Sequence, residues 1–111
     1  MKRLLLAAAV TLVALSAPAL SADRAKAIKG TMLSIFYAEV CKPKGALSPA
    51  AYKFIDYAHA DDSPTQMRAI AQEVRAEYDS IGKAEFCRRG DTVVGDAWIE
   101  KTNETAKRLQ F

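Results

Sequence analysis

Residues 63–81 read SPTQMRAIAQEVRAEYDSI, and this stretch indicates the fold class most clearly. Ser63 and Gln66 form a capping box, and Pro64 takes the first helical position, where a missing N–H is tolerated. Apolar residues then recur along one helical stripe: Met67, Ile70, Ala71, Val74, Tyr78 and Ile81. The stretch therefore predicts an amphipathic helix, and Gly82 either ends it or lies within a continuation to Cys87.

The same helical spacing recurs on both sides of this stretch, and no run of five or more residues alternates as a strand would. We predict a helix over about 23–40 and a second one that starts with Ser48 as N-cap and Pro49 behind it. After a turn at 88–90, Asp91 is expected to cap a last helix. The linkers are short, so the predicted fold is all-α, a small four-helix domain.

The helix over 23–40 has an unusually wide apolar face. At 100° per residue its apolar side chains cover roughly 200°, about twice the arc that one core contact needs. This helix is therefore expected to be central in the fold or shared with a partner. We place a partner or client surface at Leu33, Phe36 and Tyr37, and we expect a homodimer buried around these residues.

Cys41 and Cys87 are the only cysteines in the chain. The sequence contains no CxxC redox motif and no CxxCH haem motif, and two Cys with His59 are too few for a closed zinc site. In an oxidising compartment an even count favours a disulfide. A bridge that closes the long loop between Cys41 and Cys87 would contribute up to about 4 kcal/mol to the free energy of unfolding.

Residues 1–22 have the layout of a secretory signal peptide. Lys2 and Arg3 precede an apolar run over 4–15, and Pro18 and small residues follow it. The run is shorter than the roughly 20 residues of a membrane span. We expect cleavage after Ser21 or Ala22, which would leave one helical domain over 23–111 in the bacterial periplasm, without stable membrane insertion.

Removing this segment changes the charge of the chain. The whole sequence has 16 Lys+Arg against 13 Asp+Glu and a net charge of +3, and Lys2 and Arg3 belong to the segment. The remainder is close to neutral and has no polybasic stretch long enough to hold a nucleic-acid backbone. We therefore expect protein partners and no nucleic acid.

Few residues suggest catalysis. His59, beside Asp61 and Asp62, is open to two interpretations: a general base or pH sensor, or a solvated residue at a helix end. No matched nucleophile, Gly-rich phosphate loop, HExxH or GxSxG motif accompanies it. The second interpretation is the stronger one. We expect no catalytic residue, no metal site, no cofactor and no enzymatic activity.

A disulfide would also gather cations at one pole of the molecule. Lys42 and Lys44 follow the first cysteine, and Arg88 and Arg89 follow the second. This basic patch is either a site for an anion or an acidic partner, or a solvated surface.

Two short segments resemble a known family. Leu47-Ser-Pro-Ala-Ala-Tyr52 looks like the helix start after the first cysteine of the HdeA/HdeB-type periplasmic acid-stress chaperones, and Glu85-Phe-Cys-Arg-Arg89 looks like the stretch around their second. The layout of residues 41–111 is similar throughout. The loop after Cys41 is shorter than in the family, and the helix before it is longer and more apolar. The resemblance implies an acid-activated holdase that protects unfolded clients.

Acid would charge this chain strongly. With its carboxylates protonated, the mature chain would carry about +16, and such self-repulsion loosens packing while a disulfide limits the unfolding. The alternative is an immunity or inhibitor-type protein that binds one dedicated partner at neutral pH. The wide apolar face of the helix over 23–40 suits both hypotheses.

Overall fold

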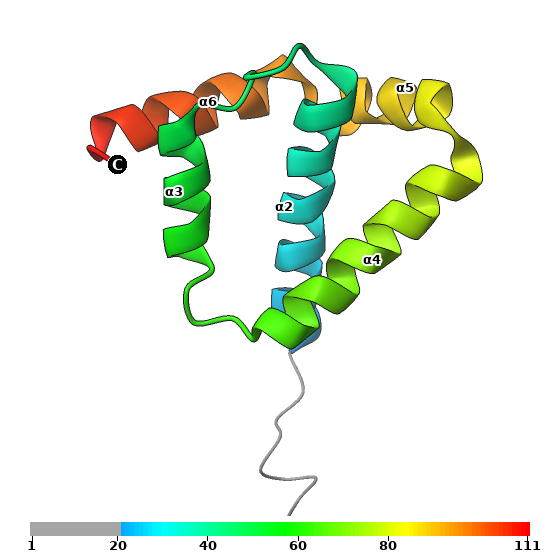
Figure 1. Ribbon diagram of the computed structural model, residues 1–111, viewed down its shortest axis with the longest axis horizontal. Coiled ribbons are helices and arrows are strands. Elements are labelled where there is room, and N and C mark those ends of the chain that lie inside the picture. The colour runs from blue at the N-terminus through cyan, green and yellow to red at the C-terminus, as the bar shows by residue number, and fades with distance from the viewer. Residues whose placement is uncertain (1–20) are drawn as a thin grey trace, which may run out of the picture.

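The computed structural model describes residues 21–111, which are almost entirely helical (Figure 1). Within this range there are five helices and no strand, so the all-α prediction is confirmed, with one helix more than expected. The helices are α2 (Ala22–Cys41), α3 (Pro49–Ala58), α4 (Pro64–Ile81), α5 (Lys83–Val93) and α6 (Gly95–Arg108). The predicted signal peptide falls on residues 1–20, outside the described range, except for its last two positions.

Serine side chains start the first three described helices. Ser21 Oγ accepts a hydrogen bond from the N–H of Arg24 at 3.1 Å, and either predicted cleavage position would remove this cap. Ser48 caps α3 through the N–H of Ala51 at 3.1 Å, and Ser63 caps α4 through that of Gln66 at 3.4 Å. The two predicted Ser-Pro helix starts are therefore confirmed.

Gly82 separates α4 from α5. Its φ of +84° lies in the region that favours glycine, and its N–H donates to the carbonyl of Tyr78 at 2.8 Å. The residues up to Cys87 then begin a new helix in a different direction. Of the two alternatives that the sequence left open, helix termination at Gly82 is the one observed.

The turn predicted at 88–90 and the cap predicted at Asp91 are both wrong. Residues 88–91 lie inside α5, which continues to Val93. The direction changes instead between Val94 and Gly95, whose φ is +65°. The Asp91 side chain accepts a hydrogen bond from the hydroxyl of Tyr37 on α2, and Gly90 packs against the ring of the same residue.

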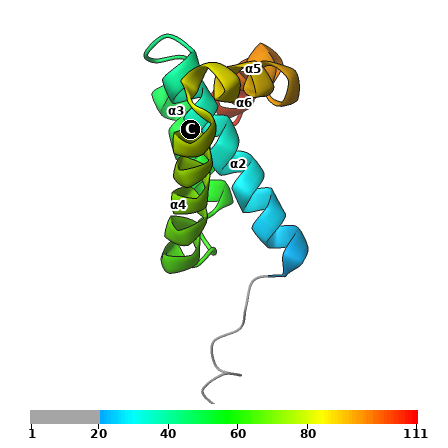
Figure 2. The ribbon, with the colours of Figure 1, turned by 90° about the vertical axis from the view of Figure 1, so that its right-hand side faces the viewer.

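The five helices form an open arrangement centred on α2. α5 and α6 follow one another along one edge, and α2, α3 and α4 extend from that edge (Figure 1). α2 packs against α4 and α5, α3 packs against α6, and α5 contacts both α4 and α6. Viewed from the side, α2 crosses α4 at an angle (Figure 2). None of the helices in residues 21–111 is both long and apolar enough to cross a membrane.

The core lies where these helices meet. It contains Tyr37 and Ala38 of α2 together with Leu47, Ala51, Ile55, Phe86, Ile99 and Ala106. Asn103 of α6 fixes the loop before α3: its Oδ1 accepts from the N–H of Ser48 at 2.9 Å, and its Nδ2 donates to the carbonyl of Ala46 at 2.8 Å. Asn103 thus joins the loop before α3 to α6.

Candidate functional site

The predicted surface on α2 is largely covered by the protein's own helices. Tyr37 is only 1% exposed, so it does not lie on an open surface in this conformation, and the homodimer stays a prediction. Leu33 and Phe36 are partly buried against the core. The wide apolar arc is explained by contacts of α2 with α4 on one side and α5 on the other.

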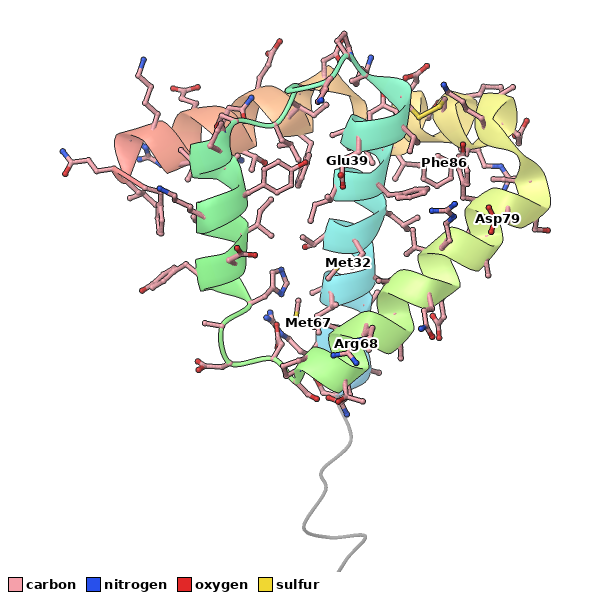
Figure 3. All side chains as sticks on the ribbon, in the orientation of Figure 1. Met32, Glu39, Met67, Arg68, Asp79 and Phe86 are labelled. Carbon is pink, nitrogen blue, oxygen red and sulfur yellow. A yellow bond between two sulfur atoms is a disulfide. The ribbon has the colours of Figure 1, made fainter. Side chains whose placement is uncertain are left out.

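Three aromatic rings from three helices meet beside α2. The Phe36 ring centroid lies 4.9 Å from that of Tyr78 on α4 and 5.5 Å from that of Phe86 on α5, and the Tyr78 and Phe86 centroids are 5.3 Å apart. All three pairs are edge-to-face, the favourable geometry for such rings. Figure 3 shows Phe86 in the space between α2 and α4. This aromatic cluster of Phe36, Tyr78 and Phe86 provides apolar contacts among α2, α4 and α5.

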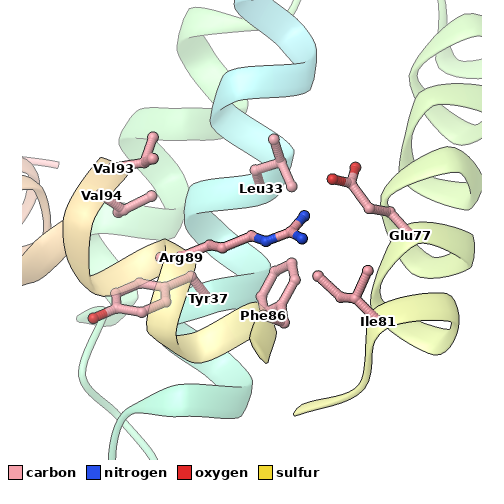
Figure 4. A pocket seen from close by; sticks show the side chains of 9 residues that line it. Leu33, Tyr37, Glu77, Ile81, Phe86, Arg89, Val93 and Val94 are labelled. Carbon is pink, nitrogen blue, oxygen red and sulfur yellow. The ribbon is translucent and has the colours of Figure 1, made fainter. Parts of the chain in front are cut away.

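An apolar cavity of about 170 Å³ adjoins this aromatic cluster. It is partly open to solvent and is formed by α2, α4, α5 and the junction that follows α5 (Figure 4). Most of its lining is apolar, and Arg89 reaches across it toward Glu77 (Figure 4). The lining of the cavity includes Leu33, Tyr37, Ile81, Phe86, Gly90 and Val94.

Tyr37 connects this cavity to a carboxylate in the last turn of α5. Its hydroxyl donates a hydrogen bond to Asp91 Oδ1, and the Lys42 ammonium lies 5.6 Å from the centre of its ring. Burial, and then the hydrogen bond to Asp91, raise the pKa of Tyr37 above its usual 10.0. The ring rests on Gly90, where a Cβ atom would lie only 2.2 Å from Tyr37 Cδ1.

At the opposite end of α2, Arg24 is bound to the loop between α3 and α4. Its Nε donates to Asp62 Oδ1 at 2.8 Å, and its Nη2 donates to Asp62 Oδ2, so the pair is bidentate. His59 Nδ1 lies 2.8 Å from the same Oδ2. The hydrogen bond from Arg24 lowers the pKa of Asp62 to about 2, and that from His59 adds to the effect although burial opposes it.

His59 is therefore not the solvated helix-end residue that the sequence favoured. It is only 9% exposed, and its ring is held by Asp62 at the end of α3. Ser63 is the nearest serine in sequence, but its side chain caps α4. The arrangement around His59 can join α2 to the α3–α4 loop, and its groups are already paired with one another. Within residues 21–111, no group of three or more His, Cys, Asp or Glu side chains could hold a metal ion.

Two lysines form further ion pairs between α2 and its neighbours. Lys29 Nζ of α2 lies 3.9 Å from Glu73 Oε2 and 4.0 Å from Glu77 Oε2 on α4. Lys42 Nζ, just after α2, lies 2.9 Å from Asp96 Oδ1 on α6. Together with the Arg24–Asp62 pair, these contacts attach both ends of α2 to neighbouring segments.

Most cations of the predicted basic patch are paired with carboxylates. Glu85 lies beside Arg88 and Arg89 on α5, and their hydrogen bonds lower its pKa to about 2. Lys42 is engaged by Asp96, and Lys44 is exposed in the loop. Three of the four cations therefore contact an acidic partner, with Arg88 and Arg89 sharing Glu85. This distribution favours the solvated-surface interpretation over an anion site.

The disulfide prediction is confirmed. Cys41 at the end of α2 and Cys87 in α5 are bonded, with their Cα atoms 5.5 Å apart. The bond joins α2 to α5 beside the buried Tyr37 and Phe86. It therefore fixes the end of α2 that lies nearest the cavity.

Sequence reasoning missed the cavity and the polar contacts that Asp62 and Asp91 make with α2. The partners of these carboxylates, Arg24 and Tyr37, lie 38 and 54 positions away, so no local spacing indicates them. Gly90 was misinterpreted, because a glycine between polar residues such as Arg89 and Asp91 is typical of a turn. In comparisons with known proteins, no family model matches the chain, and neither does any curated protein or solved structure.

Proposed function

We propose that this protein is an exported periplasmic holdase that protects unfolded client proteins during acid stress. One observation carries the proposal: the ion pairs that attach α2 to its neighbours all require carboxylates, whereas its covalent attachment to α5 does not titrate. Acid would therefore weaken the ion pairs and leave the disulfide intact. Such a function needs no catalytic step, no metal and no cofactor.

The ion pairs of α2 are distributed along its length. Asp62 faces Arg24 near the first turn, Glu73 and Glu77 face Lys29, and Asp96 faces Lys42 beyond the last turn. A protonated carboxyl group loses its charge and cannot hold these cations as strongly. Each neutralised pair also leaves a cation unbalanced, so repulsion grows as attraction is lost.

The pKa of Asp62 sets the pH range of this change. Because the pKa falls from 3.8 to about 2 on folding, the carboxylate stabilises the folded state fully above about pH 4. That contribution is lost as the pH falls from about 4 through about 2. Acid activation is therefore expected in this range.

Loosening of α2 from α4 would expose the surface that clients need. Leu33 and the aromatic cluster of Phe36, Tyr78 and Phe86 lie between these helices and are apolar. The bond between Cys41 and Cys87 would keep the loosened chain compact enough to refold when the pH returns to neutral. The resemblance of residues 47–52 and 85–89 to the acid-stress chaperones supports the same function.

Aggregation of a client enzyme, followed by light scattering, tests this proposal. We expect the oxidised protein to suppress aggregation at about pH 2.5 and to do little at pH 7, in line with acid-loosened states. The reduced protein is expected to lose the ability to release and refold on neutralisation. Leu33→Ser should weaken suppression, whereas Leu109→Ser, at a site 53% exposed on the far end of α6, should not. Absence of suppression in acid by the oxidised protein would refute the proposal.

A dedicated partner at neutral pH is the second candidate, and a different surface favours it. Tyr57 is 70% exposed and its ring centroid lies 5.4 Å from that of Phe111, next to the exposed Leu109. These apolar groups are available without any loosening, as an immunity or inhibitor-type protein requires. Pull-down at pH 7 separates the two candidates: one stoichiometric partner lost in Tyr57→Ser favours the second, and many clients in acid alone favour the first.

A further inference from the structure

The cavity beside α2 has the size and chemistry of a site for one apolar side chain. Its volume of about 170 Å³ is close to that of buried apolar cavities, roughly 150 Å³, that accept a benzene molecule. Leu33, Ile81, Phe86 and Val94 supply the apolar lining. Gly90 has no side chain, and its backbone contacts the ring of Tyr37. A larger residue at position 90 would displace this ring.

The charges at the rim of the cavity already have partners, which disfavours an ionic ligand. Arg89 is held by Glu85, with 3.0 Å between Nε and Oε1, and Glu77 faces Lys29 at 4.0 Å. An anion would have to compete with Glu85 for Arg89, and a cation would have to compete with Lys29 for Glu77. A neutral group avoids both costs, because it leaves these pairs intact while it removes apolar surface from water.

The rim also indicates that the ligand continues beyond the cavity. Val93, which contributes to the lining, is 81% exposed, so apolar surface extends outward from the opening. Arg89 is about half exposed and its guanidinium carries more N–H donors than Glu85 uses. A peptide backbone passing over the opening could place a carbonyl against Arg89 while one side chain enters the cavity.

We propose that this cavity binds a single phenylalanine-sized side chain of an extended client polypeptide. The identity of the occupant as a client rests on the proposed holdase function. Binding itself requires only the folded protein at neutral pH, because the cavity is already present in this conformation. The cavity would then be the first contact with a client, and acid would enlarge it by separating α4 from α2.

Titration of the oxidised protein at pH 7 with capped tripeptides, followed by amide chemical shifts, tests this inference. With acetyl-Gly-Phe-Gly-amide we expect saturable shifts that concentrate on residues 33–37, 77–81 and 86–94. Acetyl-Gly-Ser-Gly-amide is expected to cause none. Shifts confined to residues 54–57 and 109–111, or equal shifts with both peptides, would overturn the proposal, as would binding of toluene without binding of the phenylalanine peptide.

Variants that fill the cavity make the test specific. Leu33→Phe should weaken binding of the phenylalanine peptide at least about tenfold, since added methylene-sized groups in an apolar pocket have effects of this order. Leu109→Phe makes the same change at an exposed site and should leave binding unchanged. If Leu33→Phe fails to fold, Ile81→Phe replaces it.

The two proposals fail separately. Aggregation suppression in acid without peptide binding at pH 7 would overturn the cavity proposal and leave the holdase proposal standing. Peptide binding at pH 7 that is unaffected by Leu33→Phe and Ile81→Phe would also overturn the cavity proposal. Cavity-specific binding without acid suppression would refute the holdase function and retain the site.

Discussion

Gly90 of α5 packs closely against the ring of Tyr37 of α2. A Cβ atom at residue 90 would lie 2.2 Å from Cδ1 and 2.6 Å from Cε1 of the Tyr37 ring. Because the ring is 1% exposed and its hydroxyl is bound to Asp91, it cannot easily move aside. The sequence indicated the glycine, but its role depends on a residue 53 positions earlier and was not predictable from local spacing.

We predict that Gly90→Ala destabilises the protein by about 3 kcal/mol through overpacking. Gly30→Ala is the matched control: a Cβ atom added at this position in the middle of α2 would have nothing within 4 Å, so alanine should stabilise by about 0.5–1 kcal/mol. Urea unfolding at pH 7 measures both effects. Equal stabilisation in the two variants would show that the close approach of α2 and α5 is incorrect.

The carboxylate of Asp62 joins the α3–α4 loop to α2 through Arg24. Asp62→Asn keeps the shape of the side chain but removes the charge that Arg24 and His59 contact. The variant should be less stable than the wild type at pH 7, and the difference should shrink as the pH falls from about 4 through about 2, because the wild-type carboxyl group becomes neutral there.

Urea unfolding between pH 2 and pH 7 measures this difference. The exposed Asp79, which pairs with Arg75 on the same helix, provides the control. Asp79→Asn should change stability by less than about 0.5 kcal/mol at any pH. A difference between the wild type and Asp62→Asn that stays constant over the whole range would contradict the role assigned to this carboxylate.

At the scale of elements, the helix starts were the most predictable features. Ser48-Pro49 and Ser63-Pro64 act locally, since each serine caps an N–H three residues ahead of it. The end of α5 was not predictable in this way. Asp91 has the side chain of a typical cap, but the hydroxyl of Tyr37 engages it, and the direction of the chain changes only at Gly95.

The break between α4 and α5 depends on Gly82. Its backbone combines φ +84° with ψ 161°, a region essentially restricted to glycine. We predict that Gly82→Ala costs about 1–3 kcal/mol and favours fusion of the two helices, which would move Cys87 away from Cys41. Urea unfolding and the rate of disulfide formation from the reduced protein measure the two effects. Ser80→Ala, at an exposed position within α4, should leave both unchanged, and a Gly82→Ala variant with wild-type values would contradict this explanation of the break.

At the scale of the whole molecule, the sequence predicted the class of fold and the disulfide between Cys41 and Cys87. Both predictions rest on local patterns and on residue type: helical periodicity, helix caps and a pair of cysteines. The arrangement of helices around α2 was not predictable, because it depends on contacts such as Arg24–Asp62 and Phe36–Tyr78 between distant residues. The wide apolar face of α2 indicated a helix that is either central in the fold or shared with a partner, and the structure uses this face for α4 and α5.

The two kinds of attachment of α2 are the basis of the functional proposal. Ion pairs hold its N-terminal half to Asp62, Glu73 and Glu77, and these contacts respond to acid. At its C-terminal end the Lys42–Asp96 pair responds to acid as well, but the disulfide to α5 does not. The halves of one helix should therefore differ in their response to pH, which neither a uniformly stable nor a uniformly unfolded protein would show.

Hydrogen exchange of the oxidised protein at pH 7 and at about pH 2.5, corrected for intrinsic rates, measures this difference directly. We predict that protection of residues 22–33 and 64–78 falls at least about tenfold in acid, while residues 37–41 and 86–90 around the disulfide retain protection. In the double variant Cys41→Ser, Cys87→Ser, which lacks up to about 4 kcal/mol of stabilisation, both sets should lose protection together. Unchanged protection of residues 22–33 in acid, or equal loss in both sets of the oxidised wild type, would contradict the two-attachment mechanism.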